Sequence, residues 1–314
     1  MGDKLHKIFI DGKEGTTGLR IYDRLSGRDD IELLLLSDED RKKPECRKAM
    51  LDSADVAFLC LPDAAAMEAV AMVSNENLRI IDTSTAHRTN PEFAYGFPEL
   101  SAEYFEKLKT AKRVAVPGCH ASGFIALVEP LVSKGIISKD ANLCCHSLTG
   151  YSGGGKKMIA EYEGEERRLA LDSPRQYALG QTHKHLKEMS YITGLENAPI
   201  FCPIVADYYS GMLVTVPVFA SQLEKGYGID DIKALYKELY NGDIVRYREA
   251  ADEDGMYSSN GLSGKDYMEV SAFGNEERII LCARFDNLGK GASGAAVECL
   301  NIMLGKPLHT GLDI

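Results

Sequence analysis

The sequence lacks several features that would place it in large classes of protein. No apolar run approaches the ~18–20 residues that a membrane-spanning helix needs, so we expect no membrane partner. The formal net charge is −11 at pH 7, which disfavours nucleic acid, because its phosphates repel an acidic surface. Internal repeats and low-complexity segments are also missing. These absences leave a globular protein that acts on a small molecule.

The eight cysteines contain no C-x-x-C pair, so neither a redox motif nor a metal site is expected. Most of them lie in apolar runs, which is typical of reduced, buried thiols rather than of a disulfide framework. The opening residues carry no apolar core of a secretory signal. We therefore expect a cytoplasmic protein without a bound metal.

The first third of the chain predicts a doubly wound α/β domain. At 314 residues the chain exceeds the usual size of one hydrophobic core, so two domains are expected. Helical patterns over 16–27 and 63–74 separate apolar runs that are β-branched or rich in leucine. Such runs predict parallel strands covered on both faces. The expected strands are 7–11, 31–37, 55–62, 79–84 and 113–118.

The pattern changes after residue 119 and predicts a second, α+β domain with a mixed sheet. The expected strands there begin with "NLCCHSLTG" and continue at 212–220, 244–250 and 278–286. The last helix is rich in alanine and glycine, which allows close packing against another element. We divide the chain into 1–118, with the C-terminal helix 287–314 packed back on it, and 119–286.

A glycine-rich turn follows the first expected strand. In "GKEGTTG" the glycines are Gly12, Gly15 and Gly18, and Thr16 and Thr17 lie between the last two. Glycine lets backbone amides approach a pyrophosphate, whose negative charge a helix N-terminus also favours. The spacing G-x-x-G-x-x-G differs from the usual G-x-G-x-x-G, and a plain tight turn is the alternative. Its place at the first βα junction favours a dinucleotide cofactor.

The text after the second expected strand, "SDEDRKKP", bears on which nicotinamide cofactor binds. NAD sites favour a carboxylate on the ribose, a position that Asp38 would fill. NADP sites favour cations near the 2′-phosphate, and Ser37, Arg41, Lys42 and Lys43 offer such a pocket. A solvated loop is the alternative. The clustered cations lead us to expect NADP(H).

The stretch "VPGCHASG" places Cys119 at the start of an apolar helix, after Gly118. Aligned peptide dipoles and amide groups at a helix start hold a thiolate, and the same amides can receive an oxyanion. The alternative is a small buried side chain, which is the usual role of cysteine. We expect Cys119 to be a nucleophile.

A nucleophilic cysteine usually works with a proton carrier. "THKHLKE" supplies His183 and His185, two residues apart, and if the segment is extended we expect only one of them to face the site. The side chain of His120 is expected to diverge from its neighbour Cys119, and His87 and His146 are less favoured.

Two further stretches offer groups for a polar substrate. Arg88 in "DTSTAHR" follows the fourth expected strand, at the edge where ligands of such sheets bind, and suits a phosphate or carboxylate. "TGYSGGGKK" contains Ser152 and Gly153 in a loop of hydroxyls and amides. A surface arginine and a flexible connector are the alternatives.

Taken together, these motifs resemble the N-acetyl-γ-glutamyl-phosphate reductases of the shorter type. The motifs "DTSTAHR", "YGFPEL", "VPGCHASG", "GYSGGGKK", "THKHLKE" and "DNLGKGASGAAV" occur in that family's order over nearly the whole chain. The resemblance implies a Rossmann-like domain, an α+β dimerisation domain and a homo-oligomer, dimer or tetramer. It also implies NADPH-dependent reduction of N-acetyl-L-glutamyl 5-phosphate, an acyl phosphate, to the 5-semialdehyde in arginine biosynthesis.

By matching position, the resemblance implies roles for several residues. Cys119 would form a thioester, His185 would move the proton with His183 as the alternate, and Arg88 would hold the phosphate. Asn287, which we group with the cofactor residues, and Lys290, which we group with the substrate residues, would lie near the reacting groups. The alternatives are aspartate-semialdehyde dehydrogenase and, more distantly, a non-catalytic NADP-binding regulatory protein.

Overall fold

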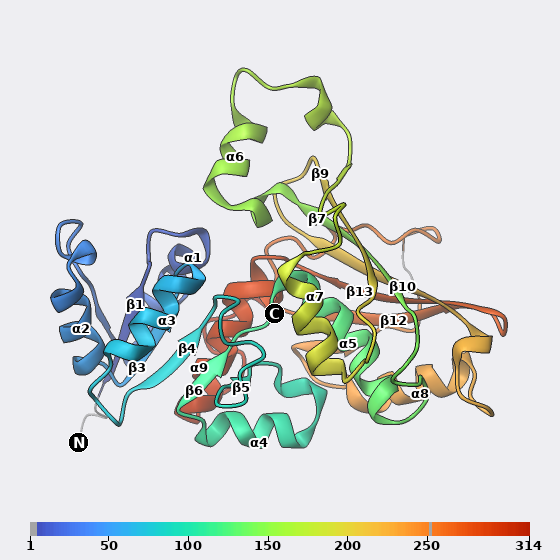
Figure 1. The fold of residues 1–314 in the computed structure, drawn as a ribbon, viewed down its shortest axis with the longest axis horizontal. Coiled ribbons are helices and arrows are strands. Elements are labelled where there is room, and N and C mark those ends of the chain that lie inside the picture. Colours follow the sequence, from blue (N-terminus) through green and yellow to red (C-terminus); the bar gives the residue numbers. More distant parts are fainter. Residues whose placement is uncertain (1–4, 251–252) are drawn as a thin grey trace. The chain divides into compact units, whose positions relative to one another are not determined.

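The computed structural model describes residues 5–250 and 253–314, and the chain divides into two compact units. Unit 1 comprises 1–98, 102–117 and 292–312, and unit 2 comprises 99–101, 118–291 and 313–314. The structure thus groups 287–291 with unit 2, whereas the sequence led us to group them with the first domain. Figure 1 shows the elements of both units.

Unit 1 is built on a parallel sheet of six strands in the order β2-β1-β3-β4-β6-β5. Every pair of neighbours in it is parallel, so the predicted doubly wound sheet is confirmed. The strands are β1 (His6–Asp11), β2 (Ile31–Leu34), β3 (Val56–Leu59), β4 (Arg79–Asp82), β5 (Ala94–Tyr95) and β6 (Arg113–Ala115).

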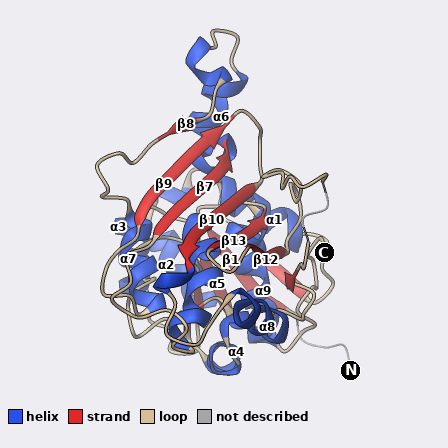
Figure 2. Ribbon diagram, turned by 90° about the vertical axis from the view of Figure 1, so that its right-hand side faces the viewer, coloured by secondary structure: helices blue, strands red, loops and turns tan. Residues whose placement is uncertain are grey.

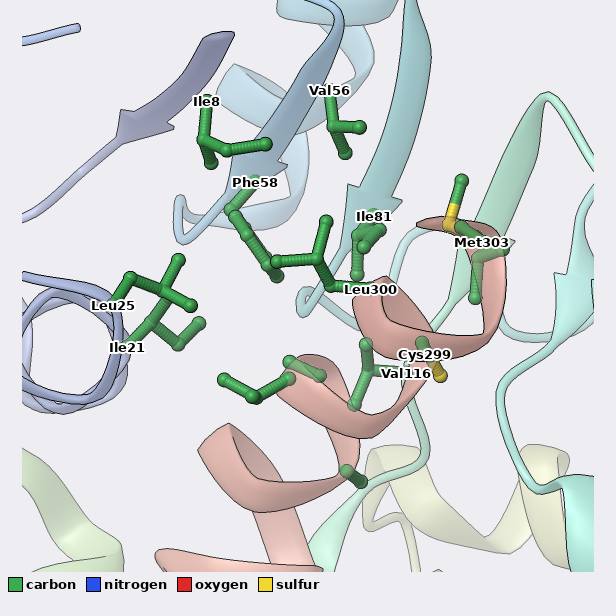
Figure 3. Packing of buried hydrophobic residues seen from close by; sticks show 14 of the residues in the cluster. Ile8, Ile21, Leu25, Val56, Phe58, Ile81, Val116, Cys299, Leu300 and Met303 are labelled. Carbon is green, nitrogen blue, oxygen red and sulfur yellow. The ribbon is translucent and has the colours of Figure 1, made fainter. Parts of the chain in front are cut away.

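Helices cover both faces of this sheet because alternate residues of each strand face opposite sides. Ile8 of β1 packs in one apolar cluster, which Figure 3 shows with Leu25 and Leu300, whereas Phe9 packs in the cluster of the other face with Leu51. The first cluster joins α1 (Thr16–Leu25), α4 (Ala102–Thr110) and α9 (Gly294–Leu304), and the second joins α2 (Pro44–Ser53) and α3 (Asp63–Met72).

Unit 2 contains the predicted mixed sheet, with seven strands in the order β11-β12-β13-β10-β7-β9-β8 (Figure 2). The pairs β7–β9 and β11–β12 are parallel and the others are antiparallel. The strands are β7 (Cys144–Gly150), β8 (Arg175–Gln176), β9 (Ile200–Ala206), β10 (Met212–Phe219), β11 (Val245–Tyr247), β12 (Met268–Gly274) and β13 (Arg278–Phe285).

The central helix of unit 2, α5 (Cys119–Ser133), is buried along most of its length and packs on β10 and β13. Pro130 inside it has no N–H to donate to the carbonyl of Ala126, and the Tyr240 hydroxyl donates to that carbonyl at 2.6 Å instead. The other helices are α6 (Gly155–Glu163), α7 (Lys184–Thr193) and α8 (Ile229–Leu239). Within the described ranges, no helix combines the length and apolarity needed to cross a bilayer.

Candidate active site

Cys119 is the first residue of α5, in the position that the sequence predicted. Gly118 is the N-cap, and its backbone N–H donates to Oε1 of Glu188 on α7 at 2.8 Å. Both groups of this bond are buried, so the carboxylate fixes the turn that presents the partly buried thiol. Glu188 is a site residue that the sequence reasoning missed, although it ends the "THKHLKE" motif.

A segment of glycine backbone lies directly against Cys119. It is the π-helix Gly289–Ser293, in which a Cβ at Gly291 would lie 3.1 Å from the Cβ of Cys119 and 3.0 Å from the carbonyl oxygen of Asp286. Only glycine therefore lets this loop approach the thiol so closely. The "DNLGKG" motif is thus part of the Cys119 surroundings within unit 2.

Three histidines form one cluster, and one of them, His120, follows Cys119 directly in α5. The ring centroids of His183 and His185 are 4.7 Å apart, and that of His120 lies 6.0 Å from the first and 5.5 Å from the second. Our expectation that only one of His183 and His185 faces a site was therefore wrong, because both rings lie near His120. The direction of the His120 side chain relative to Cys119 stays a prediction.

Hydrogen bonds hold the His120 ring at both nitrogens. Nδ1 lies 2.7 Å from Oγ of Ser147, and Nε2 lies 2.7 Å from the hydroxyl of Tyr177. Burial lowers the pKa of His120 to about 3, so its imidazole is neutral at physiological pH. Burial also raises the pKa of Tyr177, and the nearby Cys119 raises it further. Tyr177, which no motif pointed to, therefore links the thiol to the histidines.

His183 differs from His120 in its hydrogen bonding. It is the N-cap of α7, and its Nδ1 accepts a hydrogen bond from the backbone N–H of His185 at 3.2 Å. In the neutral ring this places the proton on Nε2. Burial, and secondly the charge of Lys184, lowers the pKa of His183. His185 is buried at 8% exposure on the first turn of α7.

Arg88 lies in unit 1, and two nitrogens of its guanidinium donate hydrogen bonds to backbone carbonyl groups. Its Nε donates to the carbonyl of Val116 at 2.9 Å, and its Nη2 donates to the carbonyl of Thr83 at 3.0 Å. These bonds hold the chain just before Gly118. The structure therefore shows an anchoring role, and contact with a phosphate stays a prediction.

Ser152, Gly153 and Asn287 lie together in unit 2. Nδ2 of Asn287 donates to Oγ of Ser152 at 3.0 Å, and Oδ1 accepts from the backbone N–H of Gly211 at 2.9 Å. A Cβ at Gly153 would lie 3.5 Å from the same Nδ2. Within unit 2, Asn287 thus lies with two predicted substrate residues, and its predicted contact with the cofactor stays a prediction.

Lys290, on the π-helix, is 2% exposed, and its Nζ lies 2.6 Å from Oε1 of Glu99. Its ion pair with Glu99 partly offsets the cost of burying its charge.

In unit 1, a pocket of about 340 Å³ opens beside the glycine-rich turn. It brings together Gly12, Arg41 and Lys42, as the sequence predicted, and adds two cations that the prediction did not include. Its polar lining residues are Asp11, Gly12, Lys13, Glu14, Asp38, Arg41, Lys42 and Arg47. Four of these residues are cations and three are carboxylates, so the lining carries a net positive charge that suits an anionic group.

The turn itself has the shape that a phosphate cradle requires. Gly12 has φ +86°, and a Cβ there would lie 2.3 Å from the carbonyl oxygen of Cys60. A Cβ at Gly18 would lie 2.5 Å from the carbonyl oxygen of Gly12. Gly15 is the N-cap of α1, and the amides of Thr16 and Thr17 begin the helix, where intrahelical acceptors are absent.

Two side chains of the predicted 2′-phosphate pocket, those of Ser37 and Arg41, already interact with carboxylates of the protein. Oγ of Ser37 donates to Asp40 at 2.9 Å and does not line the pocket, and Arg41 lies 3.5 Å from the carboxylate of Asp38. At the floor, Arg47 donates to Asp11 from two nitrogens, at 3.0 and 2.8 Å. Burial raises the pKa of Asp11, and the Arg47 bonds oppose that rise.

Family models match both units. A model described as "Semialdehyde dehydrogenase, NAD binding domain" matches residues 7–108. A second, described as "Semialdehyde dehydrogenase, dimerisation domain", matches residues 119–287, which begin at the candidate nucleophile.

Curated relatives align over nearly the whole chain. An N-acetyl-gamma-glutamyl-phosphate reductase of Rhizobium etli is 45% identical over 305 residues, covering 95% of this chain and 98% of the relative. N-acetyl-gamma-glutamyl-phosphate reductase 2 of Nostoc sp. is 42% identical over 318 residues, covering 98% and 99%.

Among solved structures, aspartate semialdehyde dehydrogenase II of Vibrio cholerae matches with a TM-score of 0.74 at 15% identity, covering 96% of this chain and 99% of that one. Aspartate semialdehyde dehydrogenase of Francisella tularensis gives a TM-score of 0.70 at 13% identity, covering 96% and 100%. At these identities, the likeness establishes the fold alone.

Proposed function

The chain belongs to the semialdehyde dehydrogenases and, within them, to the N-acetyl-gamma-glutamyl-phosphate reductases, and we propose that it catalyses their reaction. The reaction reduces N-acetyl-L-glutamyl 5-phosphate with NADPH and yields N-acetyl-L-glutamate 5-semialdehyde and phosphate, a step of arginine biosynthesis. The observation that carries this proposal is a cysteine at a helix start, in a turn fixed by Glu188, followed directly by His120, which clusters with two further histidines.

The first step forms a thioester on Cys119. The thiolate sulfur attacks the acyl carbon, a carbon–sulfur bond forms, and the bond to the phosphate oxygen breaks to release phosphate. The start of α5 favours the thiolate and offers backbone amides to the oxyanion that forms during attack. A thioester suits this route because the thiolate is still a competent leaving group when the aldehyde is released.

The pocket beside Gly12 fits a dinucleotide cofactor, and we propose NADP(H) as its ligand. The glycines at positions 12 and 18 let the turn pack tightly against backbone carbonyls, and Gly15, Thr16 and Thr17 at the start of α1 would supply amides to the pyrophosphate. Arg41 and Lys42 favour the 2′-phosphate of NADP, and Ser37 lies four residues before Arg41 in the chain. When bound, the cofactor supplies the hydride that reduces the thioester carbonyl.

We assign the proton transfer to His185, with His183 as the alternate. His120 is excluded as the proton carrier because its pKa of about 3 keeps it neutral and both of its nitrogens are held. It orients the cluster instead, together with Tyr177 and Ser147. The chosen histidine gives its proton to the oxyanion left by reduction and takes it back as the thiohemiacetal collapses to aldehyde and thiolate.

The remaining predicted residues receive roles around the substrate. We propose that Lys290 attracts the anionic substrate and that Ser152 and Gly153 contact it, with Asn287 holding their loop. Arg88 acts chiefly by holding Val116, and its phosphate contact is the part to be tested. The dimerisation model supports a homo-oligomer, dimer or tetramer, and we expect the cytoplasm as its location.

The test is run in the reverse direction, with purified protein, NADP⁺ and phosphate. We expect absorbance of reduced nicotinamide to grow with N-acetyl-L-glutamate 5-semialdehyde and not with aspartate semialdehyde. Cys119→Ser should lose at least about 10³-fold in kcat, because an alkoxide is harder to form than a thiolate. Turnover of the aspartate compound alone would replace the proposed substrate, and near-normal turnover of the serine variant would refute the thioester.

The role of Arg88 is tested by the phosphate dependence of the same reaction. Arg88→Ala should raise the KM for phosphate if the guanidinium contacts it. If the KM for phosphate is unchanged and kcat falls, the proposed phosphate contact is wrong, and Arg88 acts only by holding the backbone at Val116.

A further inference from the structure

A second group of sulfur and nitrogen ligands lies on the sheet of unit 2, outside the Cys119 cluster. Cys144 and His146 are two residues apart on β7 and therefore face the same side. Cys202 on the parallel neighbour β9 is paired in register with His146. The register thus brings three metal-ligating side chains together at one point of the sheet.

This cluster faces away from the catalytic helix. Cys145 and Ser147, which alternate with its β7 members, are fully buried, and Ser147 contacts His120 of α5. Cys144 and His146 must therefore point to the opposite face, where His146 is exposed. An ion could reach these ligands without passing the candidate active site.

The distances within the cluster are close to those around a tetrahedral zinc ion. Sγ of Cys144 lies 3.5 Å from Nε2 of His146, and the three ligand atoms all lie within 4.8 Å of one another. Bond lengths of ~2.3 Å to sulfur and ~2.0 Å to nitrogen place tetrahedral ligands about 3.6–3.8 Å apart. Small side-chain rotations therefore bring all three atoms to one ion.

We propose that Cys144, His146 and Cys202 bind one Zn²⁺ per chain, with water in the fourth position. Two sulfurs and one imidazole are soft to intermediate ligands that select zinc over magnesium or calcium, which prefer oxygen. Neither cysteine is in a disulfide in the structure, so both sulfurs can serve as thiolates. The sequence did not predict this site, because its ligands come from two strands that are distant in the chain.

The ion would link β7 to β9 through their side chains, in addition to the backbone hydrogen bonds between the two strands. It would have no place in the thioester chemistry, because the strand separates it from His120 and Cys119. Zinc should therefore raise the unfolding temperature of the chain, since a ligand that binds only the folded state stabilises it.

Metal binding is measured on the full chain, stripped with a chelator and kept reduced with a phosphine. Titration with Co²⁺ should produce thiolate-to-cobalt charge-transfer absorption, which one equivalent of Zn²⁺ per chain should abolish. The double variant Cys144→Ser/Cys202→Ser should lose that absorption, and His146→Ala should weaken Zn²⁺ binding at least ~10–100-fold, the loss reported even for outer-shell changes. The matched control is Cys46→Ser, which removes a partly buried thiol on α2 and should change nothing.

A second measurement needs no variant. Zn²⁺ should protect Cys144 and Cys202 from alkylation in the unmutated chain, while Cys46 stays as reactive as before, as read by peptide mass spectrometry. The proposal is wrong if Zn²⁺ protects neither cysteine, or if no charge-transfer band forms. It is also wrong if Cys119→Ser abolishes Zn²⁺ binding while the double variant retains it, because the ion then lies among the histidines of the candidate active site.

Discussion

Replacing Gly12 by alanine tests the glycine-rich turn at its tightest point. The residue has φ +86°, a conformation that costs an L-residue about 1–2 kcal/mol. The new Cβ would lie 2.3 Å from the carbonyl oxygen of Cys60, a backbone atom that cannot rotate away, and such overpacking typically costs about 1–3 kcal/mol. Gly12→Ala should therefore lower the free energy of unfolding by about 2–5 kcal/mol and weaken NADPH binding.

Two other glycines make the experiment specific. A Cβ at Gly15 would meet only ordinary contacts, at 3.4 and 3.9 Å, and a Cβ at Gly27 would meet nothing within 4 Å. Urea unfolding should therefore show a small loss for Gly15→Ala and a change of at most about 1 kcal/mol, towards stability, for Gly27→Ala. NADPH affinity is followed in parallel by nicotinamide fluorescence. A Gly12→Ala protein as stable as Gly27→Ala and equally able to bind NADPH would refute the argument from this turn.

Three further predictions concern buried polar groups. The pKa of His120 falls from 6.5 to about 3 on folding, so below pH 6.5 the unfolded chain binds a proton that the folded chain does not. Lowering the pH from 7.5 to 5 should therefore reduce the free energy of unfolding by about 2 kcal/mol. In urea unfolding, the free energy of unfolding of His120→Asn should depend correspondingly less on pH. Glu188→Ala should lower kcat and slow the alkylation of Cys119, because the backbone N–H of Gly118 loses its hydrogen-bond acceptor. Glu188→Gln keeps an acceptor oxygen, so it should reduce both rates less. Equal reductions in the two variants would contradict this reasoning. Arg47→Met should lower the free energy of unfolding by about 3 kcal/mol at pH 7, because the buried carboxylate of Asp11 loses its ion-pair partner. The loss should shrink at lower pH, where that carboxyl takes a proton. A loss that does not depend on pH would contradict this reasoning.

The strands that the sequence predicted well have a regular burial pattern. Strand β3 is buried at every residue and is apolar without interruption, whereas buried and less buried residues alternate along β10. Helix α2 was missed because Leu51 is its only fully buried residue, so its sequence carries little apolar periodicity. Strand β12 was missed although it is largely buried, because Glu269 interrupts its apolar pattern; that carboxylate is paired with Arg284 of β13, which sequence alone does not show.

Local rules also explain which site residues could be predicted. The setting of Cys119 depends on a turn and a helix start, both of which neighbouring residues encode. Arg88 and Asn287 bind backbone carbonyl and amide groups that are distant from them in the sequence. An arginine and an asparagine therefore indicated that polar contacts exist, but not which groups make them. Tyr177 came from a segment without any periodic pattern.

The histidines show how structure changes a functional assignment. Residues two apart in an extended segment face the same side, so the expectation that only one of His183 and His185 could face a site was wrong in its geometry. In the structure His183 is the N-cap of α7, His185 lies on its first turn, and both rings lie near His120. Hydrogen bonds hold both nitrogens of His120, and Nδ1 of His183 accepts the bond of the helix cap. The cap leaves His183 only Nε2 for chemistry and ties its ring to the α7 backbone, which weighs against His183 as the proton carrier and keeps His185 as our choice.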